Sequence, residues 1–444
     1  MSGRIFGKQV SSFQIIIGGF LIVILLGTGL LMLPVSSRAG RWTSIEDALF
    51  TATSAVCVTG LVIRDTATHW SFFGQAVILI LIQIGGLGIA TVTAIVATVS
   101  GRKITLLQRN TLQESIAAFH VGGILKLTWF ICKVALLAEL LGTLLLLPTF
   151  LSLYGRSGIW MALFHSVSAF CNAGFDVMGG HTGPFSSLTS FSARAGVVLP
   201  VTALIVIGGI GFLTWDDMAK HRFRFRRYRM QSKVILTATA LLVLLPATVF
   251  FFGDFSDFGL RERILAALFH AVTPRTAGFN TVDMSRLTSA GRAMTVVLML
   301  VGGAPGSTAG GVKTTTVAVL LANMAAVIRR RKHLRLFNRR IDEDTVKCAS
   351  TLMMLYILLV LLGAFIISAK EGLAFETCLF ETASAIGTVG LSLGITPALG
   401  LLSRGVLVGL MFFGRAGALT ILFAAVNSTE PQVAQYPLGR INVG

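Results

Sequence analysis

Four short stretches of this chain end in a glycine that follows two small or polar residues, a pattern that suits chemistry by the backbone. Glycine readily adopts the left-handed angles that let successive carbonyl groups point inward from an extended strand. Carbonyl oxygens held in this way can replace the water around a cation without adding charge. The four tripeptides are Val58-Thr59-Gly60, Asn172-Ala173-Gly174, Thr276-Ala277-Gly278 and Thr388-Val389-Gly390.

Each tripeptide closes a longer stretch that the chain copies four times. ALFTATSAVCVTG at 48–60 returns as ALFHSVSAFCNAG at 162–174, ALFHAVTPRTAG at 267–278 and CLFETASAIGTVG at 378–390. A spacing of roughly 110 residues is too long for solenoid repeats. The last copy ends in Thr-Val-Gly, the first letters of the TVGYG loop of potassium channels. One glycine after an apolar run could merely end a helix; four matched copies predict a cation pore with fourfold pseudosymmetry.

The composition indicates a membrane protein. The chain is 54% hydrophobic and 13% charged, with a mean hydropathy of +0.81. Apolar runs such as 15–33 and 352–367 approach the roughly 20 residues that a spanning helix needs. The net charge of +18 could suggest nucleic acid, but the basic residues lie in short loops between apolar runs. We therefore expect a lipid bilayer and no nucleic acid as the partner.

Neither a metal-ligand nor a triad spacing is found, so no enzyme is expected, and the odd number of cysteines implies no disulfide framework.

Around each copied stretch the sequence predicts a spanning helix, a short re-entrant helix and a second spanning helix. In the first repeat these are 12–34, a segment that begins where Thr43 and Glu46 fit a capping box, and 72–99. The short segments cannot cross a bilayer of about 30 Å, so they must re-enter and return. The expected fold is an all-α integral membrane protein with four such repeats around one pore. The predicted repeats are 1–110, 111–229, 230–340 and 341–444. In the same order, the three segments are 125–150, 160–171 and 195–214 in the second repeat. They are 234–252, 264–272 and 293–328 in the third, and 348–367, 373–386 and 406–426 in the fourth.

Glycine-rich points recur in the second helix of each repeat, at Gly85, Gly208, Gly302 and Gly414. Small residues let neighbouring helices approach closely in a membrane. We expect this packing role for the first two, within helices that continue unbroken.

Basic residues are concentrated in the loops that join one repeat to the next, whereas acidic residues dilute those on the other face. The positive-inside rule then places these loops and both termini in the cytoplasm of a plasma-membrane protein. The four glycine tripeptides, called the filters below, then enter the membrane from outside. Arg4 and Lys8 precede the first apolar run without a cleavage site, so this helix is expected to be retained. The basic residues of these loops are Arg102, Lys103, Arg109, Lys220, Arg222, Arg224, Arg226, Arg227, Arg229, Arg329, Arg330, Arg331, Lys332, Arg335, Arg339 and Arg340.

The second helix of the third repeat contains GGAPGSTAGG at 302–311, a composition that no helix keeps in water. Irregular backbone at membrane depth is tolerated where protein or water satisfies it. A loop that lines the cavity below the filter and obstructs the pore meets that condition. A phosphate loop is rejected, because the lysine comes one place late and no strand precedes it. The gate candidates are Gly302, Gly303, Gly306, Ser307, Thr308, Gly310, Gly311 and Lys313.

Arg415 lies in the middle of the last predicted helix. A charge at that depth costs at least about 2.5–3.5 kcal/mol, so the side chain should face the cavity. We expect an electrostatic barrier that also hydrogen-bonds the loop; pairing with an acid is the alternative.

Other polar residues flank the filters. Asp65, Asp176 and Asp283 follow three of the filter glycines and could concentrate cations at the outer mouth. It is equally consistent with the sequence that these aspartates are ordinary solvated residues of loops.

Three of the short helices carry a titratable residue at one shared position, where the first repeat has Thr51: His165, His270 and Glu381. A hydrogen bond behind the filter is expected of them, ahead of contact with the ion. Arg275, beside the third filter, should point away from the ion path and bind carbonyls or acids, because it would repel a cation there.

With these features the chain resembles the Trk/Ktr/HKT superfamily of potassium transporters. The likeness covers about 12–444 and is greatest to the membrane subunit of bacterial Ktr systems, because the chain begins directly at the first repeat. The resemblance implies potassium uptake through a channel-like pore that the 302–311 loop gates. It further implies a homodimer with one pore per protomer and a cytoplasmic ring of nucleotide-binding regulatory subunits. The bound species would be potassium, with sodium as an alternative, and no covalently bound cofactor is implied.

The filters also differ from the channel loop, because Leu61, Phe175, Phe279 and Leu391 follow the glycines where a channel has Tyr-Gly. The upper half of a channel filter is thus missing, which puts tight discrimination against sodium in doubt. Glycine in all four repeats still resembles the potassium-selective branch. A cation-coupled, sodium-dependent secondary transporter is the alternative, since broken helices also mark that class.

Overall fold

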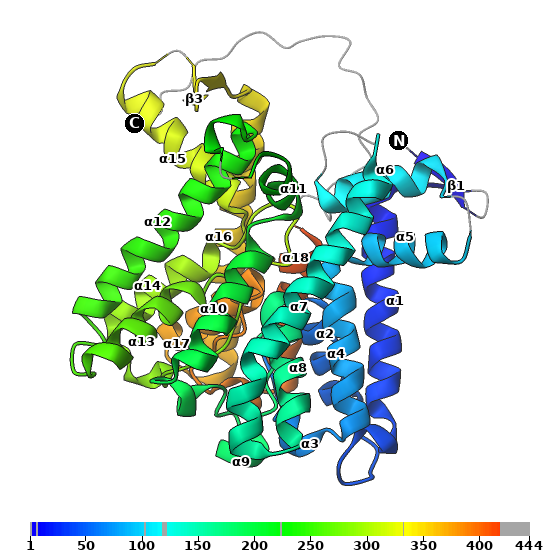
Figure 1. The fold of residues 1–444 in the computed structure, drawn as a ribbon, viewed down its shortest axis with the longest axis vertical. Coiled ribbons are helices and arrows are strands. Elements are labelled where there is room, and N and C mark those ends of the chain that lie inside the picture. The colour runs from blue at the N-terminus through cyan, green and yellow to red at the C-terminus, as the bar shows by residue number, and fades with distance from the viewer. Residues whose placement is uncertain are drawn as a thin grey trace.

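The computed structural model describes residues 2–5, 8–101, 104–117, 122–222, 224–331 and 333–417. Helices dominate these residues, and most of the long ones run along the long axis of the molecule (Figure 1). The described strands form two hairpins, β1 (Ser2–Ile5) with β2 (Lys8–Ser11) and β3 (Arg335–Leu336) with β4 (Arg339–Arg340). The predicted cytoplasmic residues Arg102, Lys103 and Lys332, and the 418–426 part of the last predicted helix, lie outside the described residues.

Among the described residues, four unbroken helices are long and apolar enough to cross a membrane: α1 (Ser12–Met32), α7 (Ile124–Tyr154), α12 (Met230–Phe252) and α16 (Glu343–Glu371). The 21 residues of α1 span roughly 31 Å, which matches the hydrocarbon core of a bilayer. Leucines cover their outward faces and are largely exposed, for example Leu26, Leu140, Leu244 and Leu358. Such faces suit contact with lipid.

A short helix follows each long one: α2 (Ile45–Val56), α8 (Ser157–Phe170), α13 (Leu260–Val272) and α17 (Phe375–Gly387). With 12 to 14 residues they reach roughly 18–21 Å, too little to cross a bilayer. Their last two turns are almost wholly buried, so they end in the interior of the molecule. The N-cap of α2 is Ser44, which accepts a hydrogen bond from the Asp47 amide at 3.2 Å. The capping box predicted from Thr43 is therefore wrong; that hydroxyl lies 3.5 Å from Nε2 of His69 instead.

The second helices of the first two repeats are broken. α4 (Phe72–Leu87) meets α5 (Ile89–Val99) at 98°, and α10 (Ala195–Gly209) meets α11 (Phe212–His221) at 97°. Each break falls at a glycine in the left-handed region, Gly88 with φ +85° and Gly211 with φ +88°. The continuous helices predicted over 72–99 and 195–214 are thus wrong, because a residue in this conformation cannot continue a right-handed helix.

Gly85 and Gly208, one turn before these breaks, have the packing role that the sequence predicts. A Cβ on Gly85 would lie closer than 3.0 Å to the carbonyl oxygen of Val56. A Cβ on Gly208 would lie as close to the carbonyl oxygen of Phe170, and a Cβ on Gly414 to that of Ile386. In three repeats, then, the second helix touches the carboxyl end of the short helix through a glycine.

The other second helices differ from each other. In the third repeat, α14 (Ser289–Leu300) and α15 (Thr314–Ile328) flank an irregular segment over 301–313. In the fourth, α18 (Leu401–Ala416) begins earlier than predicted and reaches nearly to the end of the described residues.

Smaller elements complete the two ends of the molecule (Figure 1). α3 (Thr66–His69) and α9 (Gly179–Thr182) lie at one end, whereas α5, α11, β3 and α6 (Leu106–Ile116) lie at the other. The described basic loop residues, such as Arg226 and Arg329, belong to the second of these ends. The 3-10 helices are η1 (Pro34–Ser36), η2 (Thr189–Phe191), η3 (Phe225–Arg227), η4 (Met284–Arg286) and η5 (Thr396–Ala398).

Candidate functional site

The four filter glycines meet in a closed ring. Each has a left-handed φ, between +69° and +92°. A Cβ added to any of them would lie closer than 3.0 Å to the carbonyl oxygen of the residue before the next filter glycine. The carbonyl oxygen of each middle filter residue therefore lies next to the glycine of the preceding filter, and the strands follow one another in chain order. The contacts join Gly60 to Ala173, Gly174 to Ala277, Gly278 to Val389, and Gly390 to Thr59.

The first residue of each filter tripeptide is left-handed as well. These residues are not glycines, and such a conformation costs them about 1–2 kcal/mol each. Strain of this kind persists where the surroundings hold it and is common at functional sites. The backbone thus alternates between left-handed and ordinary angles along every filter. The φ values are 56° for Val58, 59° for Asn172, 72° for Thr276 and 51° for Thr388.

A hydroxyl group from the short helix, or from its C-cap in the third repeat, forms a hydrogen bond with the backbone of each filter or of the residue after it. Ser54 accepts a hydrogen bond from the amide of Gly60, and Ser384 from that of Gly390, both at 3.1 Å. In the other two repeats the hydroxyls donate, at 2.7 Å, to the carbonyls of the residues that follow the glycines. These four residues are absent from the sequence-based prediction, although the copied stretches do carry the signal. Every copy has a serine or threonine at its seventh position: Ser54, Ser168, Thr273 and Ser384.

The polar residues at the shared helix position also face away from the ring. Nδ1 of His165 lies 2.7 Å from the Met161 carbonyl, and Nε2 of His270 lies 3.1 Å from Oγ1 of Thr295. Glu381 accepts hydrogen bonds from Ser392 Oγ (2.5 Å), Leu393 N (3.0 Å) and Thr396 Oγ1 (2.9 Å). The hydrogen-bonding role predicted for this position is present in all three.

The buried Arg275 points toward α12, where its Nη2 donates to Thr239 Oγ1 at 3.3 Å. The guanidinium group is therefore directed away from the filter, as the sequence predicts. Its partner is a hydroxyl, where an acid or a carbonyl was expected.

A cavity of about 170 Å³ lies directly outside the glycine ring, and all four filter glycines line it. Of the three aspartates considered from the sequence, Asp176 is the one that lines this cavity. Asp65 is buried and accepts from the amides of Thr68 and Phe185, both at 2.9 Å. Asp283 is exposed and caps η4. These two have structural roles.

The irregular segment 301–313 forms a loop whose ends are joined. Val301 and Val312 form a parallel bridge, Gly302 N donates to the Val312 carbonyl at 2.8 Å, and Thr314 N donates to that of Gly303 at 3.0 Å. The loop therefore leaves the helix axis and returns to it at nearly the same point.

The loop lies beneath the filters. A Cβ on Gly310 would lie closer than 3.0 Å to Oγ1 of Thr388, in the fourth filter. Thr308 Oγ1 donates to the carbonyl of Phe170, the last residue of α8, at 3.1 Å. The predicted gate residues thus lie next to the ends of two filters.

The broken helix α10–α11 holds the tip of the loop. Ala304 N donates to the Gly209 carbonyl at 2.9 Å, and Phe212 N donates to that of Gly306 at 2.7 Å. The loop and the α10–α11 break therefore satisfy each other's backbone groups, as backbone at membrane depth requires. Two side chains close hydrogen bonds within the loop, Ser307 to the Ala304 carbonyl and Lys313 Nζ to that of Ala309.

Arg415 joins three parts of the structure. Its guanidinium group donates to the carbonyls of Thr308 in the loop and of Gly85 in α4, and to that of Gly86 at 3.1 Å. The hydrogen bond to the loop is as predicted. None of the ion pairs found among the described residues includes this arginine, so the alternative of an acid partner does not hold there.

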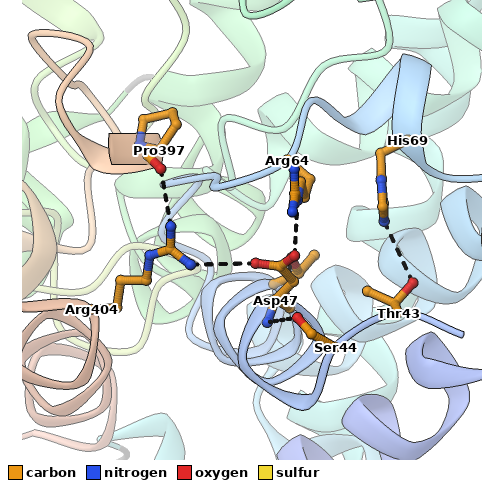
Figure 2. A network of polar contacts seen from close by, with 8 residues as sticks. Thr43, Ser44, Asp47, Arg64, His69, Pro397 and Arg404 are labelled. Carbon is orange, nitrogen blue, oxygen red and sulfur yellow. Dashed lines mark hydrogen bonds and ion pairs between the residues drawn. The ribbon is translucent and has the colours of Figure 1, made fainter. Parts of the chain in front are cut away.

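A cluster of charged residues connects the first and last repeats near the amino ends of α2 and α18 (Figure 2). Asp47, in the first turn of α2, lies 2.8 Å from Arg64 Nε and 3.5 Å from Nη1 of Arg404 in α18. Arg404 Nη2 also donates to the Pro397 carbonyl at 3.0 Å. This connection closes the ring of repeats outside the filters, and sequence reasoning missed it.

Comparison with known proteins identifies the family. A family model described as TrkH, cation transport protein, matches residues 7–433. The potassium/sodium uptake protein NtpJ of Enterococcus hirae is 38% identical over 97% of this chain and 96% of its own. The Ktr system potassium uptake protein B of Bacillus subtilis is 36% identical, with the same coverage of both chains.

The fold has a solved counterpart. The crystal structure of the potassium transporter TrkH from Vibrio parahaemolyticus matches with a TM-score of 0.70 at 18% identity, covering 93% of this chain and 85% of that one. The prediction of an all-α integral membrane protein is thus confirmed, as is the family resemblance. The family match also confirms that the chain is a cation transporter and not an enzyme. On this evidence the chain is a multi-pass membrane protein of the TrkH family of cation transport proteins.

Proposed function

We propose that this chain carries potassium ions into the cell through a channel-like pore whose filter is the glycine ring. One observation carries the proposal: four left-handed glycines contact one another's filter carbonyls in a closed cycle. Four strands in this arrangement offer oxygen atoms from every side to a cation that has lost its water. The names of the relatives support potassium, and in one case sodium, as the ion.

The 301–313 loop is the proposed gate. It lies beside Thr388 and the end of α8, on the inner side of the filter, and Arg415 binds its Thr308 carbonyl. Its hydrogen bonds with α10–α11 join backbone groups, which can be exchanged for water when the cavity fills. An ion leaving the filter would meet both the loop and the positive charge of Arg415.

The proposed setting is the plasma membrane, with both termini and the basic end of Figure 1 in the cytoplasm. We further propose a homodimer with one pore per protomer and a cytoplasmic ring of nucleotide-binding subunits. Two relatives are named as protein B of a Ktr system, which supports a partner protein.

The repeat limits at 229/230 and 340/341 fall between elements, whereas 110/111 falls inside α6; the division into four repeats stays a proposal.

Flux measurements on the purified chain in liposomes test the proposal. Potassium and sodium uptake are compared with and without an imposed sodium or proton gradient. The pore predicts potassium flux down its own gradient, without a second ion, and less sodium flux. Potassium uptake that stops when the sodium gradient is removed would instead establish a sodium-coupled secondary transporter.

A further inference from the structure

A second ring of side chains lies just outside the glycine ring. The residue two places after each filter glycine lines the same cavity of about 170 Å³. This is the place where the TVGYG loop of a channel would continue with backbone carbonyls. The four side chains belong to Val62, Asp176, Asn280 and Ser392.

These side chains differ in what they can offer a cation. Val62 has no polar atom. The Ser392 hydroxyl donates to Glu381 at 2.5 Å and accepts from the Gly394 amide at 2.8 Å, so it is already engaged. Oδ1 of Asn280 is buried and has no hydrogen-bond partner among the described residues. Asp176 uses Oδ1 to accept from the Met178 amide at 2.9 Å, which orients the carboxyl group through one of its two oxygens.

Asp176 is also the one charged residue among those that line the cavity. The neighbouring hydroxyl of Thr396 already donates to Glu381. The cavity is therefore lined by a carboxylate residue from the second repeat and by a residue from the third whose buried amide oxygen has no partner among the described residues; each lies two positions beyond a filter glycine.

We propose that Asp176 and Asn280 form an outer cation site, at which the transported monovalent cation exchanges part of its water shell before it enters the glycine ring. This inference rests on the proposed function. Carboxylate and amide oxygens are the ligands that hard cations prefer. A site in a conducting pore must bind weakly enough to release the ion, and one negative charge suits that requirement. In the described part of the chain no three His, Cys, Asp or Glu residues gather into a metal-binding group, so a tightly held metal is not offered here.

Uptake kinetics on purified protein in liposomes, at low ionic strength, test the site. Asp176→Asn removes the charge at nearly constant size and should raise the KM for potassium about threefold or more, because it weakens cation accumulation at the mouth. The maximal rate should change less than twofold. Block by external magnesium, which competes for the same oxygens, should weaken in parallel.

Asn280→Asp provides the opposite change, since it adds a second carboxylate beside the first. The KM should fall and magnesium block should strengthen. Asp283→Asn is the matched control: it removes an aspartate from the same outer face but outside this cavity, and its kinetics should match the wild type.

The outcomes separate the outer site from the filter. Wild-type KM and magnesium block in both Asp176→Asn and Asn280→Asp would overturn the outer site and leave the filter proposal intact. If Asp176→Asn does not yield folded protein, Asn280→Asp decides by itself, with an unchanged KM as the contrary result. A wild-type protein that carries no potassium at all would overturn the proposed function and this site together.

Discussion

Gly390 of the fourth filter lies against the carbonyl group of Thr59 of the first, so close that a Cβ on this glycine would be within 3.0 Å of the oxygen. The two residues belong to opposite ends of the chain, and their contact completes the cycle that the other three filter contacts begin. Arg404 and Asp47 connect the same two repeats farther out. The first and last repeats are thus neighbours around one axis.

A side chain on any filter glycine should weaken the preference for potassium. Gly60→Ser, Gly174→Ser, Gly278→Ser and Gly390→Ser would each place a Cβ against a neighbouring carbonyl, and the left-handed angle adds about 1–2 kcal/mol of strain. A change of that size in the ion sites corresponds to roughly a tenfold fall in the ratio of potassium to sodium flux. The measurement is tracer uptake of both ions into liposomes.

Gly405→Ser is the control for these variants, because Gly405 lies in α18 with open space around it. Its flux ratio should equal that of the wild type. Four filter variants that all keep the wild-type ratio would show that the glycine ring does not select the ion.

The copied stretches allow most of the filter to be predicted from the sequence. Four repetitions of an apolar run that ends in glycine identify the short helices and the strands after them. The same logic fails at the broken helices. Gly85 and Gly88 lie three residues apart in the same apolar run, yet one packs against Val56 and the other ends the helix with φ +85°. Local sequence cannot distinguish the two, because contacts with other repeats decide which glycine bends.

Contacts between distant residues account for the rest of what was missed. Asp47 and Arg404 are 357 positions apart, and each looks like an ordinary residue of an outer loop or helix end. Arg415 could be assigned to the cavity because a charge at that depth must find partners. Its partners in α4, by contrast, are carbonyls of the last turn before the break at Gly88, and this break was not foreseen.

Shortening the loop should increase potassium flux. Deleting residues 305–308 removes the carbonyls of Gly306 and Thr308, which contact Phe212 and Arg415, while the Val301–Val312 bridge that joins the loop ends is kept. We expect flux to rise about tenfold and any dependence on a cytoplasmic regulator to weaken. Arg415→Gln, which loses the charge and keeps an amide donor, should raise flux less. Folded protein of equal or lower flux after the deletion would mean that the loop is not the main gate.

Potassium affinity should depend on pH through Asp176. Burial is the main reason why the pKa of this carboxyl group is raised from 3.8 to about 7; the hydrogen bond from the Met178 amide lowers it, and the nearby Asp65 raises it. The group is thus largely neutral at pH 6 and ionised at pH 8. The KM for potassium should accordingly fall as the pH rises from 6 to 8, by about the factor that separates the wild type from Asp176→Asn. Uptake by the Asn variant, measured in the same buffers, should lose this dependence; an equal slope in both proteins would assign the titration to another group.

The last prediction concerns the basic residues that follow α15, the helix after the proposed gate loop. α15 begins at Thr314, directly after the loop, and ends at Ile328, so its 15 residues extend roughly 22 Å from the loop. Arg329, Arg330 and Arg331 continue the chain at the far end and are exposed. A protein that binds these residues could displace α15 as a rigid body and so move the loop.

Neutralising the three arginines to glutamine should therefore weaken the response to nucleotide when a Ktr-type regulatory subunit is present, while the ratio of potassium to sodium flux stays unchanged. The alternative is that the arginines only set the topology and bind anionic lipid, with a binding free energy of about 1 kcal/mol for each arginine. Reconstitution in neutral lipid removes that contribution. The control replaces Arg224, Arg226 and Arg227, which are exposed in the loop between α11 and α12 and carry the same charge. If the nucleotide response is lost in the α15 variant and kept in the control, these arginines couple the regulator to the gate; equal responses in both would leave lipid binding as their role.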